Sequence, residues 1–208
     1  MKKGILFDLD GTLWDVGEAM AAVWTEALGG FNCALREVTP EMICSVMGMT
    51  EEQIVAKFCP DLTEKEGRAL LAKCAELQGE HLAREAILFS GLGDTLRALS
   101  DEYTLAVVSN CGANYLEYFL LYPEVAGLFT DYEYRRTGLC KAENIRLVAS
   151  RNSLDAVLYV GDTLWDKQAA DAAGVPFLHA AYGFGEVPEG TPAIRDIRDL
   201  PDAVKELI

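Results

Sequence analysis

The sequence has few histidines and no paired cysteines. Only 2 of its 208 residues are histidines, and neither His81 nor His179 has a partner at the spacing of a metal site or a catalytic triad. The 6 cysteines are scattered along the chain without a CxxC pair. Zinc binding and a disulfide framework are therefore not expected, and the cysteines are interpreted as reduced thiols.

Basic residues are also scarce. The chain has 18 Lys and Arg against 33 Asp and Glu, a formal net charge of −15, and no basic run is longer than a residue pair. Such a surface repels phosphate backbones and anionic headgroups, so neither nucleic acid nor a membrane is expected as a partner.

The short apolar run before Asp8 is too brief for a signal h-region or a membrane span, which predicts a cytoplasmic protein.

Half of the residues are hydrophobic, and many of them occur in short continuous apolar runs. These runs predict buried strands at 4–7, 103–109, 156–161 and 175–180. Segments with helical periodicity lie before and between the later strands, near 91–100, 112–121, 142–151 and 165–173. Alternating strands and helices predict an α/β fold, a doubly wound parallel sheet with right-handed crossovers.

A long helical insertion interrupts this pattern after the first strand. Periodicity predicts helices over 18–28, 40–47, 51–58 and 63–84, and no convincing strand is found among them. We therefore expect a Rossmann-like core of residues 1–14 and 87–208 and a small helical cap of residues 15–86. The segment 182–192 is interpreted as a turn-rich surface loop because of its glycines and prolines.

Two carboxylates follow the first strand in the motif Asp8-Leu9-Asp10-Gly11-Thr12. Separated by one residue, they can both face a ligand, and Gly11 allows the backbone to turn closely. An EF-hand calcium loop counted from Asp8 would need Gly at its sixth position and Glu at its twelfth, but Leu13 and Ala19 stand there. The motif therefore favours catalysis over calcium binding.

Three further polar clusters follow or lie between the later strands: Ser109-Asn110, Lys141, and Gly161-Asp162-Thr163 with Asp166. Each has an ordinary interpretation by itself, as a helix cap or a surface lysine. Their order along the chain, however, puts all of them at the carboxyl edge of one sheet, where α/β folds bind ligands. This coincidence predicts a single polar site.

These motifs together resemble the haloacid dehalogenase superfamily, in its phosphatase and phosphomutase branch with a helical cap, the branch of phosphoglycolate phosphatase and β-phosphoglucomutase. The resemblance covers essentially the whole chain. It implies a phosphatase that acts on a small phosphorylated metabolite, with Asp8 as the nucleophile and Asp10 as the general acid and base. It further implies that Lys141 pairs with Asp8 and the phosphoryl group, whose oxygens would be held by Thr12, Ser109 and Asn110.

The same resemblance implies Mg²⁺ as the cofactor. Its ligands would be Asp8, the backbone carbonyl of Asp10 and Asp162, while Asp166 would ligate through water or orient the others. This agrees with elementary electrostatics, because a carboxylate that attacks a dianionic phosphate is repelled unless a cation neutralises the charge. Lys141-Ala142 and Ser90-Gly91 depart from the Lys-Pro and Pro-Gly steps of many relatives, but neither change removes a reacting group.

Two alternatives to a phosphatase stay open. A sugar-phosphate mutase of the β-phosphoglucomutase type would use the same aspartates, although the segment 48–52 lacks the Arg or Lys that would grip a second phosphate. The second alternative is a non-catalytic binding protein on the same fold.

Three further residues lie near the motifs. Trp14 is the preferred candidate for a pocket wall, and oxidation of Cys111 or Cys140 could disturb the neighbouring motifs. The sequence does not determine the oligomeric state.

Overall fold

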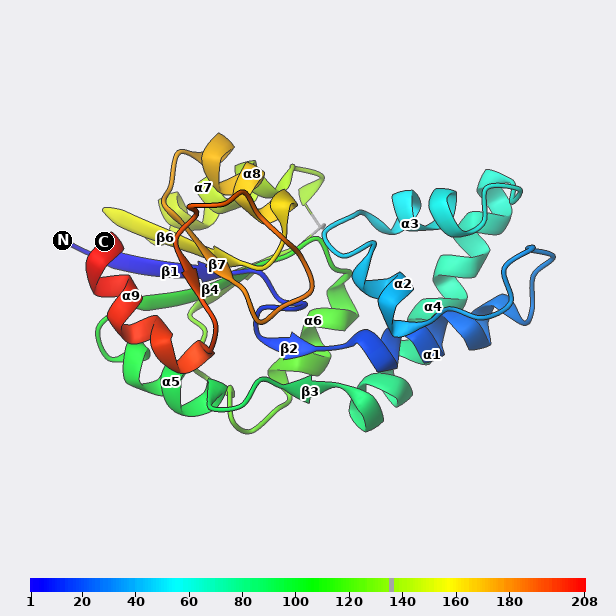
Figure 1. The fold of residues 1–208 in the computed structure, drawn as a ribbon, viewed down its shortest axis with the longest axis horizontal. Helices are drawn as coiled ribbons and strands as arrows, with labels where there is room; N and C mark the ends of the chain where they lie inside the picture. The colour runs from blue at the N-terminus through cyan, green and yellow to red at the C-terminus, as the bar shows by residue number, and fades with distance from the viewer. Residues whose placement is uncertain (135–136) are drawn as a thin grey trace. The chain divides into compact units, whose positions relative to one another are not determined.

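The structure is a computed structural model, and it describes residues 1–134 and 137–208. The chain divides into two compact units (Figure 1). The first consists of Met1–Asp15 with Leu88–Ile208, and the second of Val16–Ile87. Two short strands, β2 (Trp14–Asp15) and β3 (Ile87–Leu88), lie where the chain leaves and re-enters the first unit.

A parallel sheet forms the centre of the first unit. In the described part of the chain its strand order is β5-β4-β1-β6-β7-β8, and every neighbouring pair is parallel. The central strands are apolar and buried on both faces, as a parallel sheet covered by helices requires. The strands are β1 (Lys3–Phe7), β4 (Thr104–Val108), β5 (Asp131–Glu133), β6 (Ala156–Gly161), β7 (Phe177–Ala180) and β8 (Ala193–Ile194).

Helices cover both faces of this sheet (Figure 1). On one face, α7 (Lys141–Arg151) and α8 (Leu164–Ala173) share an apolar core with alternate residues of β1, β4 and β6. The opposite face carries α5 (Leu92–Ser100), α6 (Ala113–Leu120) and α9 (Leu200–Leu207), the last preceded by a 3-10 helix, η2 (Ile197–Asp199). The doubly wound parallel α/β fold predicted from the sequence is confirmed.

The register of the central strands determines which residues can meet. Phe7 in β1 pairs with Val107 in β4 on one side and with Val160 in β6 on the other. The residues that follow these three strands therefore leave the sheet at the same edge. Those residues begin with Asp8, Ser109 and Asp162, which lie beyond the ends of adjacent strands.

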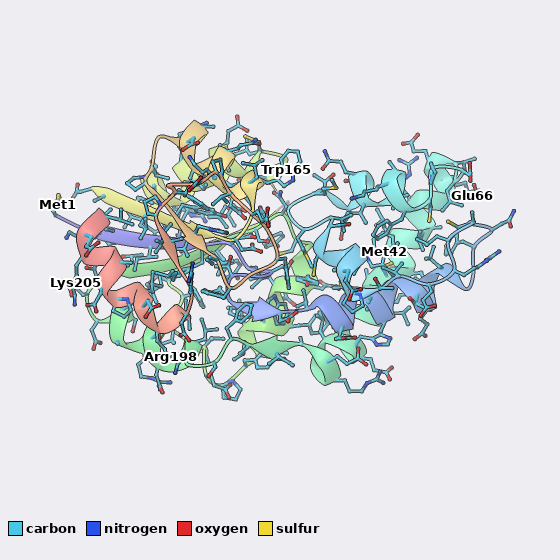
Figure 2. All side chains as sticks on the ribbon, viewed as in Figure 1. Met1, Met42, Glu66, Trp165, Arg198 and Lys205 are labelled. Atoms are coloured by element: carbon cyan, nitrogen blue, oxygen red, sulfur yellow. The ribbon has the colours of Figure 1, made fainter. Side chains whose placement is uncertain are left out.

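The second unit is helical, and its helices are α1 (Gly17–Leu28), α2 (Pro40–Cys44), α3 (Glu51–Phe58) and α4 (Glu64–Glu85). Thr50 and Thr63 begin α3 and α4 with reciprocal capping boxes. The second box uses Glu66, whose side chain is labelled in Figure 2. Trp24 packs edge-on against Phe58 in a separate apolar core. Across the described residues, no helix combines the length and apolar character needed to cross a membrane.

Candidate active site

Asp8 lies at the centre of the polar cluster, directly after β1. Its backbone N–H donates to the carbonyl oxygen of Val160 over 2.8 Å, which extends the pairing of β1 with β6 by one residue. Its side chain is buried and accepts a hydrogen bond from Lys141 Nζ at Oδ1 over 2.8 Å. The strand pairing thus fixes the backbone of Asp8 while a buried lysine fixes its carboxylate.

Lys141 joins two aspartates that are distant in the sequence. Its Nζ lies 2.8 Å from Asp8 Oδ1 and 2.7 Å from Asp166 Oδ1, and all three side chains are buried. Burial alone would lower the pKa of Lys141, but the charges of Asp166 and Asp8 outweigh burial and hold the pKa well above 10.5. Lys141 is therefore a cation, and it is not a surface residue.

Asp166 is held by the first turn of its own helix. Thr163 begins α8 with a capping box in which its backbone N–H and its hydroxyl donate to Asp166 Oδ2 over 3.0 and 2.7 Å. The hydroxyl of Tyr159 approaches Asp166 Oδ1 at 3.3 Å and also donates to the carbonyl oxygen of Val108 over 2.9 Å. These contacts leave the Asp166 carboxylate little freedom to rotate.

Asp162 is fully buried, and the loop after β7 fixes its carboxylate. The backbone N–H of Phe184 donates to Asp162 Oδ2 over 2.8 Å, and Thr12 Oγ1 lies 3.5 Å from Asp162 Oδ1. His179, for which no catalytic role was predicted, lies with Nε2 3.1 Å from the carbonyl oxygen of Asp162. Residues of two neighbouring strand ends and a loop therefore surround this aspartate.

The interpretation of 182–192 as merely a turn-rich surface loop was wrong for its first residues. The hydroxyl of Tyr182 donates to the carbonyl oxygen of Thr12 over 2.9 Å. A Cβ on Gly183 would lie 2.7 Å from Asp162 Oδ2 and closer still to the carbonyl oxygen of Gly11, so the two backbones approach as only glycine allows. Gly11 itself has a φ of +76°. The glycines that suggested a loop also permit this contact.

Asp8, Asp162 and Asp166 form the one group of three potential metal ligands found in the described residues. One carboxylate oxygen of each lies within 4.8 Å of the others, and all three residues are buried. Among the described residues, Lys141 is the one cation that forms ion pairs with this cluster. An all-oxygen donor set with excess negative charge fits a hard divalent cation such as Mg²⁺ better than a soft one.

Two carboxyl groups of this cluster, those of Asp8 and Asp162, have raised pKa values. Burial, followed by the charge of Asp166, raises the pKa of Asp8 from 3.8 to about 7 despite the opposing effect of Lys141. Burial and the charges of Asp166 and Asp8 likewise raise the pKa of Asp162 well above 3.8. Crowding buried carboxylates is therefore unfavourable unless a proton or a second cation compensates.

Asp10 is half-buried and accepts two hydrogen bonds at one oxygen. Trp14 Nε1 and the Tyr115 hydroxyl donate to its Oδ1 over 2.7 and 2.8 Å. Desolvation raises the pKa of Asp10 to about 6, against the opposing effect of the bonds from Tyr115 and Trp14. Trp14 is fully buried, so the expectation that it forms a pocket wall was wrong. Tyr115 was not identified from the sequence.

The second predicted cluster follows β4. Ser109 is buried, and its hydroxyl accepts a hydrogen bond from the backbone N–H of Cys111 over 3.3 Å, while Asn110 is half-buried. Burial and the charge of Asp10 raise the pKa of the Cys111 thiol, which therefore stays protonated. Cys140 is exposed and precedes α7. All predicted site residues thus lie at the carboxyl edge of the sheet.

Fold and site together define an α/β enzyme with a buried lysine and a carboxylate cluster at the carboxyl ends of a parallel sheet. The family model for haloacid dehalogenase-like hydrolases matches residues 5–180, and the chain belongs to this family. It is therefore a hydrolase by descent, and the resemblance found in its motifs is confirmed.

Curated relatives and solved structures extend this likeness to nearly the whole chain. A phosphoglycolate phosphatase from Salmonella typhimurium is 26% identical over 88% of this chain and 82% of its own. An N-acetylmuramic acid 6-phosphate phosphatase from Pseudomonas aeruginosa is 26% identical over 99% of this chain and 93% of its own length. The crystal structure of a predicted phosphoglycolate phosphatase from Haemophilus somnus matches with a TM-score of 0.86, 24% identity and 98% coverage of both chains, which shows the shared fold.

Proposed function

We propose that this hydrolase is a cytoplasmic Mg²⁺-dependent phosphatase that removes the phosphoryl group from a small phosphomonoester through a covalent intermediate on Asp8. The observation that carries this proposal is the contact of Lys141 with both Asp8 and Asp166, beside the buried carboxylate of Asp162. A nucleophilic carboxylate, a fixed cation and a second cation site are the parts that phosphoryl transfer to an aspartate requires. The family and its phosphatase relatives support the same reaction.

Magnesium would be held by Asp8, Asp162 and the backbone carbonyl of Asp10, with Asp166 binding through water or orienting the other ligands. When bound, Mg²⁺ would neutralise charge on the attacking carboxylate and on the phosphoryl oxygens. Lys141 would add a fixed positive charge beside Asp8, and its short contact with that carboxylate supports this role. Thr12, Ser109 and Asn110 would bind the phosphoryl oxygens.

The first half-reaction would transfer the phosphoryl group to the protein. Asp8 would attack phosphorus, so that a bond forms between its carboxylate oxygen and phosphorus while the bond to the leaving oxygen breaks. Asp10 would give its proton to that oxygen, which departs as an alcohol. The raised pKa of Asp10, about 6, supports this step because it keeps a protonated fraction near neutral pH.

The second half-reaction would hydrolyse the aspartyl-phosphate. Asp10, now a carboxylate, would take a proton from a water molecule that attacks the phosphorus, and Asp8 would leave as the free carboxylate with inorganic phosphate. We propose that the core of residues 1–14 and 87–208 carries this chemistry and that the helical insertion of residues 15–86 selects the substrate.

The test is release of phosphate by the purified protein from a panel of phosphorylated metabolites, with Mg²⁺ and with a chelator. The names of the relatives supply the first two substrates, phosphoglycolate and N-acetylmuramic acid 6-phosphate. We expect release that depends on the metal and is abolished in Asp8→Asn, whose fold is unchanged by circular dichroism, whereas Asp10→Asn slows both half-reactions. Isomerisation of a sugar phosphate faster than phosphate release would support a mutase instead, and substantial activity in Asp8→Asn would exclude Asp8 as the nucleophile.

A further inference from the structure

Two buried aromatic side chains bind the same oxygen of Asp10. Trp14 donates from its indole N–H over 2.7 Å and Tyr115 from its hydroxyl over 2.8 Å, both to Oδ1. Trp14 belongs to β2, just after the first motif, whereas Tyr115 comes from α6 on the face of the sheet opposite α7. Two separate elements of the first unit therefore converge on one carboxylate oxygen.

Both donors are themselves rigidly packed. Trp14 is 0% exposed and Tyr115 is 5% exposed. Their rings meet edge-to-face with centroids 5.5 Å apart, and Trp14 makes a second such contact with Phe119 at 5.3 Å. Neither ring can turn without disturbing the core, so the carboxyl group of Asp10 cannot rotate without losing both hydrogen bonds.

We infer that Trp14 and Tyr115 are positioning residues that determine which oxygen of Asp10 transfers the proton. This inference rests on the proposed function. Because Oδ1 accepts two hydrogen bonds, its lone pairs are engaged, and a proton carried by Asp10 resides on Oδ2. During transfer, the Oδ2–H bond of Asp10 breaks and an O–H bond forms on the leaving oxygen as that oxygen separates from phosphorus.

The consequence is a dependence on the leaving group. An alkoxide leaves phosphorus only with protonation, whereas nitrophenolate is stable enough to leave with little help from an acid. The ratio kcat/KM reports events up to departure of the leaving group. A variant in which the Asp10 carboxyl is misoriented therefore has a much lower kcat/KM for an alkyl phosphate than wild type, but a nearly unchanged kcat/KM for nitrophenyl phosphate. A variant with general structural damage has a lower kcat/KM for both substrates, by the same factor.

The experiment compares wild type with Tyr115→Phe, which removes only the hydroxyl. We expect kcat/KM to fall roughly tenfold for the alkyl phosphate that wild type hydrolyses best, and to change by less than about twofold for nitrophenyl phosphate. Tyr118→Phe is the matched control, because Tyr118 is a half-buried tyrosine on the same helix, and it should change neither value. Trp14→Phe is a second variant, expected to show the same selective loss.

A double-mutant cycle makes the assignment specific. In the background of Asp10→Ala, removal of the Tyr115 hydroxyl should have no further effect on the alkyl phosphate, since the group that it positions is gone. Equal losses on both substrates, or an undiminished loss in the Asp10→Ala background, would overturn the inference while leaving the phosphatase proposal intact. If wild type releases phosphate in a metal-dependent way from neither the alkyl phosphate nor nitrophenyl phosphate, the inference and the phosphatase proposal are both overturned.

Discussion

The backbone N–H of Phe184 donates to Oδ2 of Asp162 over 2.8 Å, although the two residues follow different strands of the sheet. This bond makes the loop after β7 part of the candidate site. From the same loop, Tyr182 binds the carbonyl oxygen of Thr12 in the first motif. The loop thus connects the first and the last motifs and orients one of the carboxylates proposed to bind Mg²⁺.

We predict that Gly183→Ala weakens metal binding without unfolding the protein. The added Cβ would lie 2.7 Å from Asp162 Oδ2 and closer to the carbonyl oxygen of Gly11, so the loop must move away and release the bond from Phe184. The Mg²⁺ concentration that gives half-maximal activity should rise about tenfold, as is typical when an outer contact to a metal ligand is lost. The measurement is phosphate release across a magnesium titration.

The matched control for this change is Gly30→Ala. A Cβ on Gly30 would lie 3.7 Å from the nearest atom, the carbonyl oxygen of Ala27, which is an ordinary contact. Its magnesium titration should match that of wild type. A Gly183→Ala protein with an unchanged titration would mean that the loop contact does not orient Asp162.

The strands that could be predicted from the sequence were those with continuous apolar runs. The run 156–161 forms β6 (Ala156–Gly161), and the run 103–109 forms β4 (Thr104–Val108), because burial on both faces favours apolar residues at successive positions of a central strand. Strand β5 (Asp131–Glu133) was not predicted. It is a short edge strand with two carboxylates, and its place in the sheet depends on pairing with β4 rather than on its composition.

The same distinction applies to the site. Asp8, Lys141 and Asp162 could be predicted because each follows or lies between strands in an order that brings them to one edge. Phe184 contributes only its backbone N–H, which no side-chain pattern reveals, and the neighbouring glycines are the one sequence signal for its close approach. Tyr115 was missed because a tyrosine inside an apolar helix resembles a core residue, as indeed most of its ring is.

We predict that Lys141→Met strongly destabilises the metal-free protein. The change leaves the buried carboxylates of Asp8 and Asp166 without their shared cation, and removing one partner of a buried ion pair costs about 3 kcal/mol in the free energy of unfolding. Saturating Mg²⁺ should recover part of this loss, because it supplies positive charge to the same carboxylates. Denaturant unfolding with Mg²⁺ and with a chelator measures both effects.

Lys167→Met serves as the control for loss of a lysine. Lys167 pairs with Asp171 over 2.8 Å on the surface of α8, where the aspartate side chain is 59% exposed. Such pairs contribute at most about 1 kcal/mol, and Mg²⁺ should not change the cost. If Lys141→Met were no more destabilising than Lys167→Met, the buried network would not depend on its cation.

We predict that stabilisation by Mg²⁺ grows as the pH rises. The folded pKa of Asp8, about 7, lies above the value of 3.8 expected in the unfolded chain, so between these values the folded state holds a proton that the unfolded state has released. The contribution of the Asp8 carboxyl to the free energy of unfolding of the metal-free protein therefore falls as the pH rises through that window. Since Mg²⁺ binds the ionised carboxylate, the rise in melting temperature on adding the ion should be larger at about pH 7.5 than at about pH 5. In Asp8→Asn, which has no proton to lose there, the difference between the two pH values should shrink. A magnesium-induced shift in wild type that is equal at both would show that no buried carboxyl of this cluster exchanges its proton for the metal.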